Sequence, residues 1–513
     1  MKPFDENGAF CPTANGDGLR RVALRGAAVT MLSQTAVFAV QMLATVVLAR
    51  LLTPADFGLL AMVTTFSLLL MNFGLNGFTE VVLQREDVDH RLASNLFWIN
   101  VAMGIVLAVG FAAAGPLLAW LYAEPRVIAV AGAIALTILF TSVSVEHLAL
   151  LMRAMRFADV SANQILARAI SVSVAIVLAC MGSGYWALVA GAVALPLATS
   201  AGAWIWCRWI PGLPRRDDRT IPALRFAIYT YGCFTVGYFM RNMDNLLIGW
   251  RFGPEALGLY KKAFDLFTIP VEVSAPVTRV AVSALSRLTG DSARRGRHLL
   301  GALAPLAFIG MGLGVNLTLI GKDLLFLLLG PQWTESGLIF TFLAPATGLM
   351  LIYLVQVWIH LSIGRADRLF RWGIFEFTMI TVLFLLGLRW GPLGVAAAWV
   401  AYFCVFTIPA LRYAGRPAGL GVAAIVDAVW KYVLASALAG AASAVIIRGL
   451  PSFSGASGPI AALMRIVMVS IVFATLYLCA VILFHRGLEP IRHVTKLLRD
   501  MAGPAPLEPV SKA

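Results

Sequence analysis

The stretch from Arg241 to Glu272 carries ionisable side chains inside an otherwise apolar part of the sequence. Arg241 and Asp244 are three residues apart, so they share one face of a helix. Lys262 and Asp265 have the same spacing. A charge inside a membrane costs at least a few kcal/mol unless it meets a partner or faces a cavity. The chemistry that fits this pattern is ion pairing, oxyanion binding by arginine, or proton exchange by carboxylates.

These charges lie on either side of a turn near Arg251–Glu255. Because a helix rises 1.5 Å per residue, residues equally far from that turn lie at one depth. The spacing therefore predicts two cross-helix ion pairs, Arg241–Asp265 and Asp244–Lys262. One interpretation is a structural lock that pins the hairpin.

The other interpretation is a site for an anionic ligand approached by Arg241, because the positions 200 residues earlier are uncharged. Those positions are Gln41, Ala44, Met62 and Thr65. A lock that the fold required would be expected in both places. Asn245 belongs to the same candidate site, and Glu272, deeper in its helix, is a candidate for ion coupling.

Uncharged amides recur at helical spacing in two earlier segments. Gln34 and Gln41 are seven residues apart, and Asn72 and Asn76 are four apart. Amides can hydrogen-bond sugar hydroxyls without a counter-ion, or they can hold neighbouring helices together. The sequence leaves both roles open for these four residues.

The elements that position these residues are membrane helices. The chain has 513 residues, of which 60% are hydrophobic and 13% charged, whereas a soluble protein carries roughly a quarter charged residues. A helix needs about 20 mostly apolar residues to cross a bilayer, and run lengths of this kind exclude a barrel. The sequence predicts an all-α polytopic protein with about 14 transmembrane helices, near 27–49, 58–80, 95–121, 127–150, 163–182, 185–207, 224–250, 256–280, 298–320, 335–361, 369–388, 391–411, 428–448 and 460–484.

Lysine and arginine predict the orientation of these helices. With the N-terminus inside, the inner segments hold roughly three times as many of them as the outer loops, and basic loops stay on the cytoplasmic side. Both termini are therefore expected in the cytoplasm. The formal charge of +14 then describes the inner membrane face, and no nucleic-acid partner is predicted.

One motif occurs twice at an offset of 200. Pro54 and Gly58 in LTPADFGLLA correspond to Pro254 and Gly258 in FGPEALGLY. Further echoes predict two parallel six-helix repeats that form two lobes around a central cavity, with two extra C-terminal helices, an arrangement typical of alternating access. The predicted parts are a disordered cytoplasmic tail (1–26), an N-terminal bundle (27–207), a cytoplasmic linker (208–223), a C-terminal bundle (224–411), helices 13 and 14 (412–484), and a cytoplasmic amphipathic helix with a tail (485–513).

The motifs LARLLTPADFGLLA and RNMDNLLIGWRFGPEALGLYKKAFDLFTIP resemble those of the polysaccharide transporter family. This family contains the Wzx-type oligosaccharide and lipopolysaccharide flippases of the multidrug/oligosaccharidyl-lipid/polysaccharide exporter superfamily. The resemblance covers nearly the whole chain. It implies a flippase of the bacterial inner membrane that moves lipid-linked oligosaccharide to the periplasmic leaflet for O-antigen or exopolysaccharide synthesis. Arg241 would then meet the lipid pyrophosphate and the amides would meet the sugars.

Other classes of function are rivals to this one. The sequence has no P-loop and no HExxH motif, so neither ATP hydrolysis nor a metal site is predicted, and the chain is expected not to be an enzyme. A cation-coupled drug antiporter of the same superfamily and a membrane O-antigen polymerase or ligase are the alternatives. No cofactor is expected, and coupling to a proton or sodium gradient is left open. The expected partners are lipid-linked oligosaccharide, membrane lipids and polysaccharide assembly proteins.

Overall fold

The computed structural model describes residues 3–6, 8–10, 18–85, 88–286, 292–419, 421–449 and 458–502. Across these ranges the chain is almost wholly helical, with isolated β-bridges only in and beside the N-terminal segment. It forms two compact units, Met1–Lys261 and Lys262–Ala513. Residues 503–513, in the predicted C-terminal tail, lie outside the described ranges.

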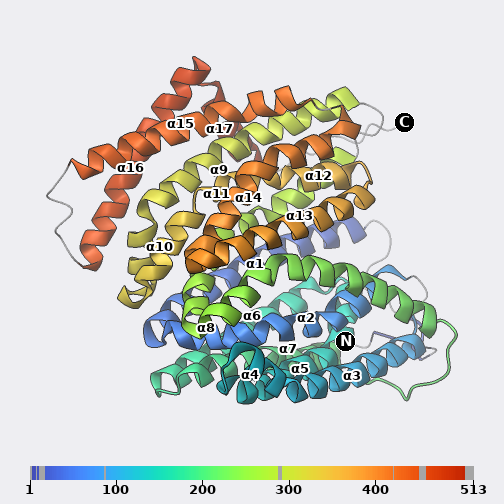
Figure 1. The fold of residues 1–513 in the computed structure, drawn as a ribbon. Coiled ribbons are helices and arrows are strands. Elements are labelled where there is room, and N and C mark those ends of the chain that lie inside the picture. Colours follow the sequence, from blue (N-terminus) through green and yellow to red (C-terminus); the bar gives the residue numbers. More distant parts are fainter. Residues whose placement is uncertain are drawn as a thin grey trace, which may run out of the picture. The chain divides into compact units, whose positions relative to one another are not determined.

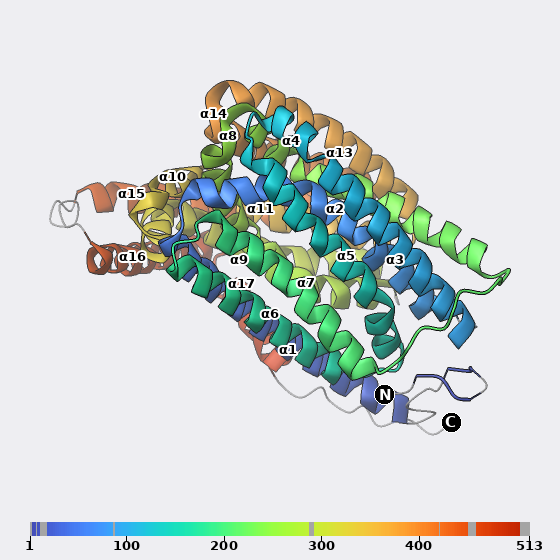
Figure 2. The same cartoon turned by 90° about the horizontal axis from the view of Figure 1, so that it is seen from below.

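The first unit is a helical bundle in which α5 is central. α5 packs against α2, α3 and α7, while α6 packs against α1 and α7 (Figure 2). Its helices are α1 (Gly18–Leu51), α2 (Pro54–Gln84), α3 (His90–Ala113), α4 (Gly115–Tyr122), α5 (Arg126–Arg153), α6 (Phe157–Cys180), α7 (Tyr185–Cys207) and the first part of α8 (Thr220–Ser286).

Local sequence explains the two sharp breaks that matter for the site. Thr53 caps α2: its hydroxyl accepts from the Asp56 N–H, and the Asp56 carboxylate accepts from the Thr53 N–H at 2.9 Å. Pro54 follows at the first helical position, where a missing N–H costs nothing. Within α8 the helix is interrupted at Gly253, whose φ of 80° suits glycine.

Part of the predicted disordered tail packs on the first unit. The Phe4 ring lies 5.5 Å from the ring of His90 and 6.0 Å from that of Trp209. The guanidinium of Arg153 lies 5.0 Å from the centre of the Phe10 ring. Aromatic and cation–π contacts therefore hold residues that the sequence assigns to a free chain.

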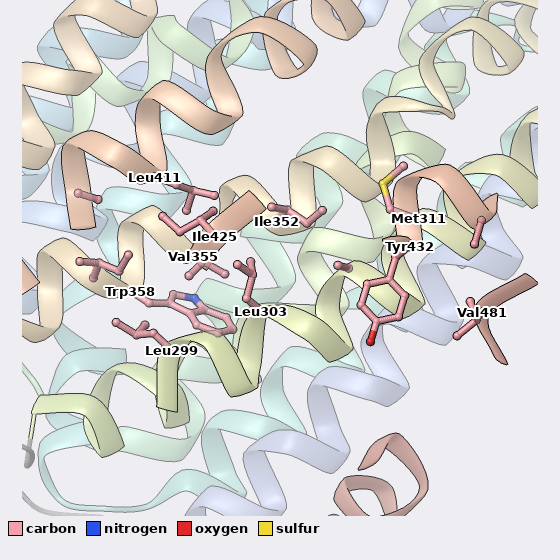
Figure 3. Packing of buried hydrophobic residues seen from close by; sticks show 14 of the residues in the cluster. Leu299, Leu303, Met311, Ile352, Val355, Trp358, Leu411, Ile425, Tyr432 and Val481 are labelled. Atoms are coloured by element: carbon pink, nitrogen blue, oxygen red, sulfur yellow. The ribbon is translucent and has the colours of Figure 1, made fainter. Parts of the chain in front are cut away.

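The second unit has its core between α9 and the helices that follow. α9 packs against α10, α11, α15 and α16 (Figure 1). Figure 3 shows this apolar core, which includes Leu303, Trp358 and Tyr432. The remaining helices are α9 (Ser292–Leu329), η1 (Pro331–Trp333), α10 (Thr334–Leu343), α11 (Ala346–Tyr353), α12 (Val355–Ser362), α13 (Ala366–Gly387), η2 (Leu388–Trp390), α14 (Gly391–Gly415), η3 (Arg416–Ala418), α15 (Val422–Arg448), α16 (Pro459–His485) and α17 (Glu489–Ala502).

The fourteen predicted spans all fall on helical segments, although the span at 95–121 covers α3 and α4 and the span at 335–361 covers α10, α11 and α12. Large apolar side chains such as Trp120, Met181 and Leu483 are more than 70% exposed. A surface of this kind needs lipid. The chain is an all-α, multi-pass membrane protein. The described residues contain ten helices long and apolar enough to cross a membrane, or eleven if one bent pair counts as a single span.

The predicted number of fourteen spans and the six-helix repeats stay predictions, and three features account for the lower number. The bent pair, Pro331–Leu343 with Ala346–Ser362, breaks by 53°, and Asp367–Gly415 counts as one stretch although two spans are predicted there. α8, on which the spans at 224–250 and 256–280 fall, is not among the ten, and charged residues recur along it.

The division into units also differs from the predicted linker at 208–223, because it falls between Lys261 and Lys262 inside α8. The first part of α8 therefore belongs structurally with α1–α7. The contacts that join it to α2 belong to the candidate site described next.

Candidate functional site

The two copies of the repeated motif lie against each other inside the first unit. A Cβ placed on Gly58 would lie 1.6 Å from the carbonyl oxygen of Pro254, and a Cβ placed on Gly258 would lie 1.9 Å from that of Pro54. Such separations are far inside van der Waals contact, so any side chain at either position would collide with backbone. α2 and α8 therefore cross at these two glycines with backbones touching, through equivalent residues of both motifs.

Two tyrosines extend the contact between α2 and α8. Tyr238 donates a hydrogen bond to the Thr65 carbonyl at 2.6 Å, and Tyr231 donates to the Leu69 carbonyl at 2.9 Å. The Tyr231 ring also lies edge-on to Phe73, 5.0 Å between centres. Buried hydroxyl groups need partners, and here the partners are backbone atoms of the other motif's helix. The contact continues along α2, beyond the glycine crossing.

Asp244 is completely buried and accepts a hydrogen bond from the Tyr260 hydroxyl at 2.7 Å, across the break in α8. Its neighbour Asn245 is also buried, and the side-chain oxygen of Asn245 has no hydrogen-bond partner in the described part of the chain. Beyond the break, Lys262 Nζ lies 3.8 Å from Asp265 Oδ2. The structure thus supplies a tyrosine partner that the spacing of charges did not predict.

The remaining charged candidates of α8 are exposed. Arg241 and Glu272 each present the side chain at the helix surface. The cross-helix pairs Arg241–Asp265 and Asp244–Lys262 stay predictions. The roles in substrate binding or ion coupling also stay predictions for the five candidates of α8, which are Arg241, Asp244, Asn245, Asp265 and Glu272.

Of the predicted amides, Gln41 has the most informative contact. Its side-chain oxygen accepts a hydrogen bond from Arg168 Nη1 at 2.9 Å, which joins α1 to α6. Gln34, seven residues earlier, is exposed. The helical spacing of amides indicates Gln41 but does not connect it with Arg168, because the two are 127 positions apart in the chain.

The asparagines of α2 are less informative. Asn72 donates to the Leu68 carbonyl of its own helix at 2.7 Å. Asn76 lies among residues of α2 whose side chains fall outside the described part of the structure. A sugar-binding role for these amides stays a prediction.

A buried polar cluster in the second unit has no counterpart among the predicted site residues. Tyr353 donates to Glu376 at 2.9 Å, and its hydroxyl also lies 2.9 Å from that of Tyr402. Trp372 Nε1 donates to the same Tyr353 oxygen at 2.7 Å. Tyrosine and tryptophan read as apolar in a membrane span, so periodicity gives no signal for this network.

Glu146 and His147 are both fully buried in α5. Neither carboxylate oxygen of Glu146 has a hydrogen-bond partner within the described ranges. His147 instead contacts the Trp209 carbonyl at 3.1 Å and stacks on Trp204 with ring centres 4.2 Å apart. The two residues are therefore not partners of each other.

The segment between α7 and α8 is tied to the start of α3. Asn95 donates to the Arg215 carbonyl at 2.7 Å and accepts from the Arg215 N–H at 2.9 Å.

Arg219 lies 2.7 Å from Asp217 and 2.8 Å from Asp89. Hydrogen bonds from Arg219 lower the pKa of Asp217 to about 2, so this carboxylate stays ionised at physiological pH. A cavity of about 320 Å³ lies nearby, lined by Val81, Arg85, Pro222, Ala223 and Phe226.

Comparison with known proteins gives consistent relatives. Residues 47–337 match a family described as polysaccharide biosynthesis protein. The chain is 24% identical to the teichuronic acid biosynthesis protein TuaB of Bacillus subtilis over 63% of its length and 68% of the relative. It is 22% identical to the succinoglycan biosynthesis transport protein ExoT of Rhizobium meliloti, over 77% and 80%. It is 20% identical to the lipopolysaccharide biosynthesis protein WzxC of Escherichia coli, over 76% and 80%.

Two solved structures share the fold. The lipid II flippase MurJ in an inward closed conformation superposes with a TM-score of 0.70 at 13% identity, covering 90% of this chain and 99% of that one. An inward-facing MATE family multidrug transporter of the MOP superfamily gives a TM-score of 0.60 at 12% identity, covering 76% and 95%. At these identities the likeness establishes the fold alone.

Proposed function

The chain belongs to the polysaccharide biosynthesis protein family, and from this premise we propose that it is a flippase for a lipid-linked oligosaccharide. It moves this substrate from the cytoplasmic to the periplasmic leaflet by alternating access, within the synthesis of O-antigen or an exopolysaccharide. One relative is a succinoglycan transport protein, and a protein with the same fold is a lipid II flippase.

The observation that carries this proposal is the reciprocal crossing at Gly58 and Gly258. Two helices that carry equivalent motifs touch backbone to backbone at one end of the first unit. Contacts this close between equivalent elements suit a gate that closes fully in one state and separates in the other. In the proposed orientation this end faces the periplasm, so the gate would close on that side.

Arg241 and its neighbours have a proposed role in substrate binding. Arg241 is exposed on α8, and its planar guanidinium suits the diphosphate of a carrier lipid. Asp244, which accepts a hydrogen bond from Tyr260, and Asn245 lie on the same helix as Arg241. The amides of α1 and α2 would meet sugar hydroxyls. Asp265 and Glu272 are the candidates for coupling to a proton or sodium gradient.

The location that we propose is the bacterial inner membrane, with both termini in the cytoplasm. The excess of Lys and Arg in alternate loops supports it. Polysaccharide assembly proteins are the proposed partners in the membrane. α17 would lie on the inner leaflet, because its apolar residues fall on one face of the helix, opposite Arg492 and Lys496.

A drug antiporter remains the second candidate, since a multidrug transporter has the same fold. The family match favours polysaccharide export over that activity. A polymerase or ligase would need catalytic groups. In contrast, one relative is described as a transport protein, and one protein with the same fold is described as a flippase. We therefore propose transport without covalent chemistry.

Deletion of the gene tests the proposal. The deletion strain should accumulate one lipid-linked oligosaccharide on the cytoplasmic side, and its drug sensitivity should stay that of the parent. Drug hypersensitivity without any glycan accumulation would favour the antiporter instead.

A further inference from the structure

Arg168 places a permanent positive charge near the middle of α6, a helix long and apolar enough to cross the membrane. The guanidinium group cannot lose its proton in a protein. Arginines at such depth therefore pair with an acid, reach the membrane surface or serve a ligand.

The partner of Arg168 is neutral. Its Nη1 donates to Gln41 Oε1 at 2.9 Å, and within the described part of the chain no carboxylate lies at ion-pair distance from it. Arg465 in the second unit shows the contrast, because it binds both carboxylate oxygens of Asp323 at 2.6 to 3.2 Å. The charge of Arg168 is thus held in place but not neutralised.

The contact with Gln41 also determines which part of the guanidinium is left over. Arg168 Nε is buried and has no hydrogen-bond partner among the described residues. With Nη1 engaged by Gln41, the edge formed by Nε and Nη2 remains. This edge is one of those through which arginine binds two oxygens of a single carboxylate or phosphate. A buried N–H without an acceptor is unfavourable, and an arriving oxyanion would remove that penalty.

The position of Arg168 around α6 is compatible with a ligand. Leu166, Ile170 and Val177 are about half exposed and mark the face that meets lipid. Arg168 follows Leu166 by two residues, about 200° around the helix. Gln164, one turn before Arg168, is exposed although it also lies away from that lipid face. The side of α6 that carries Arg168 is therefore polar and partly open.

We propose that Arg168, oriented by Gln41, binds an oxyanion of the transported substrate within the first six-helix bundle. This inference rests on the proposed function and adds a second anion site to it, separate from Arg241 on α8. The ligand group is a carboxylate of an acidic sugar or a phosphate of the carrier lipid, since both present two oxygens to one arginine edge.

The test uses full-length protein in nanodiscs of zwitterionic phosphatidylcholine, which adds no net lipid charge. Thermal unfolding is followed while D-glucuronate, inorganic diphosphate or, as the neutral control, D-glucose is titrated. At least one anion should raise the melting temperature of the wild type. In Arg168→Gln the half-saturating concentration of that anion should rise about tenfold or more, because a charge-assisted contact is lost.

Three further variants make the result specific. Arg168→Lys should fall between wild type and Arg168→Gln, and Gln41→Leu should weaken binding without abolishing it. Arg389→Gln removes an exposed arginine elsewhere and should leave binding unchanged. If Arg168→Gln does not fold, the lysine and Gln41 variants carry the comparison.

The anion that responds identifies the ligand group: glucuronate points to an acidic sugar and diphosphate to the carrier lipid. Equal half-saturation in wild type and the Arg168 variants, or no stabilisation beyond that by glucose, would overturn the proposal. A wild-type protein that fails to flip any lipid-linked glycan would instead reject the proposed function, and it would leave the binding result as it stands.

Discussion

Gly58 and Gly258 contact each other's helices reciprocally: a Cβ on Gly58 would strike the Pro254 carbonyl, and a Cβ on Gly258 would strike the Pro54 carbonyl. The motif repeated in the sequence is thus a contact surface that meets its own second copy. Glycine is required on both sides because the backbones themselves touch.

Gly58→Ala and Gly258→Ala should each force α2 and α8 apart, because the obstructing atoms are backbone carbonyls. Overpacking of this kind typically costs about 1–3 kcal/mol, which here would disfavour the closed gate. Spin labels on cysteines at Leu51 and Trp250, both exposed, should report longer distances in a background without native cysteines.

The matched control for this measurement is Gly232→Ala in α8, where an added Cβ meets nothing within 4 Å. This variant should give the same distance distribution between the two spin labels as the wild type. Unchanged distances in both gate variants would show that the crossing is not a gate.

The hairpin of α8 offers a charge-swap experiment. Arg241→Asp and Asp265→Arg should each lower the yield of folded protein, because each variant would leave a charge of the span without its predicted partner. The double variant should recover much of that loss if the two side chains meet. Additive losses in the double variant would mean that they do not.

Two buried carboxylates should respond oppositely to removal. Glu146→Leu removes a group with no hydrogen-bond partner among the described residues, so the melting temperature in detergent should stay constant or rise. Asp244→Leu leaves the Tyr260 hydroxyl without its acceptor, so the free energy of unfolding should fall by about 1–3 kcal/mol. Similar destabilisation of both variants would contradict this contrast.

The sequence predicts the helices of this protein well, because apolar run length is a strong signal. It also reveals the echo of Pro54 and Gly58 at Pro254 and Gly258. It could not show that the two copies touch, since a repeat does not say which faces meet. The partner of Asp244 was missed for another reason: Tyr260 reads as an apolar residue of the span.

Side-chain contacts between residues far apart in the chain could not be predicted from the sequence either. Arg168 and Gln41 lie 127 positions apart, and no local pattern connects them. Tyr231 and Tyr238 join the first part of α8 to α2, far away in the sequence. Side-chain contacts of this kind follow from packing and not from periodicity.

Orientation can be tested with single cysteines at two exposed positions, Pro214 and Glu255. In intact cells an impermeant thiol reagent should label Glu255→Cys and spare Pro214→Cys, because the basic loops stay inside. After membrane permeabilisation both should react. Labelling of Pro214→Cys from outside would reject the fourteen-span topology.

Outer-leaflet appearance of the lipid-linked glycan tests the central claim most directly. The glycan that accumulates in the deletion strain is purified and reconstituted with the protein in vesicles, and its access to a membrane-impermeant glycosidase is followed over time. Vesicles with wild-type protein should expose the inner-leaflet glycan rapidly, and vesicles with Arg241→Gln should expose almost none. Exposure at the same slow rate with and without the wild-type protein would contradict the claim that this protein is a flippase.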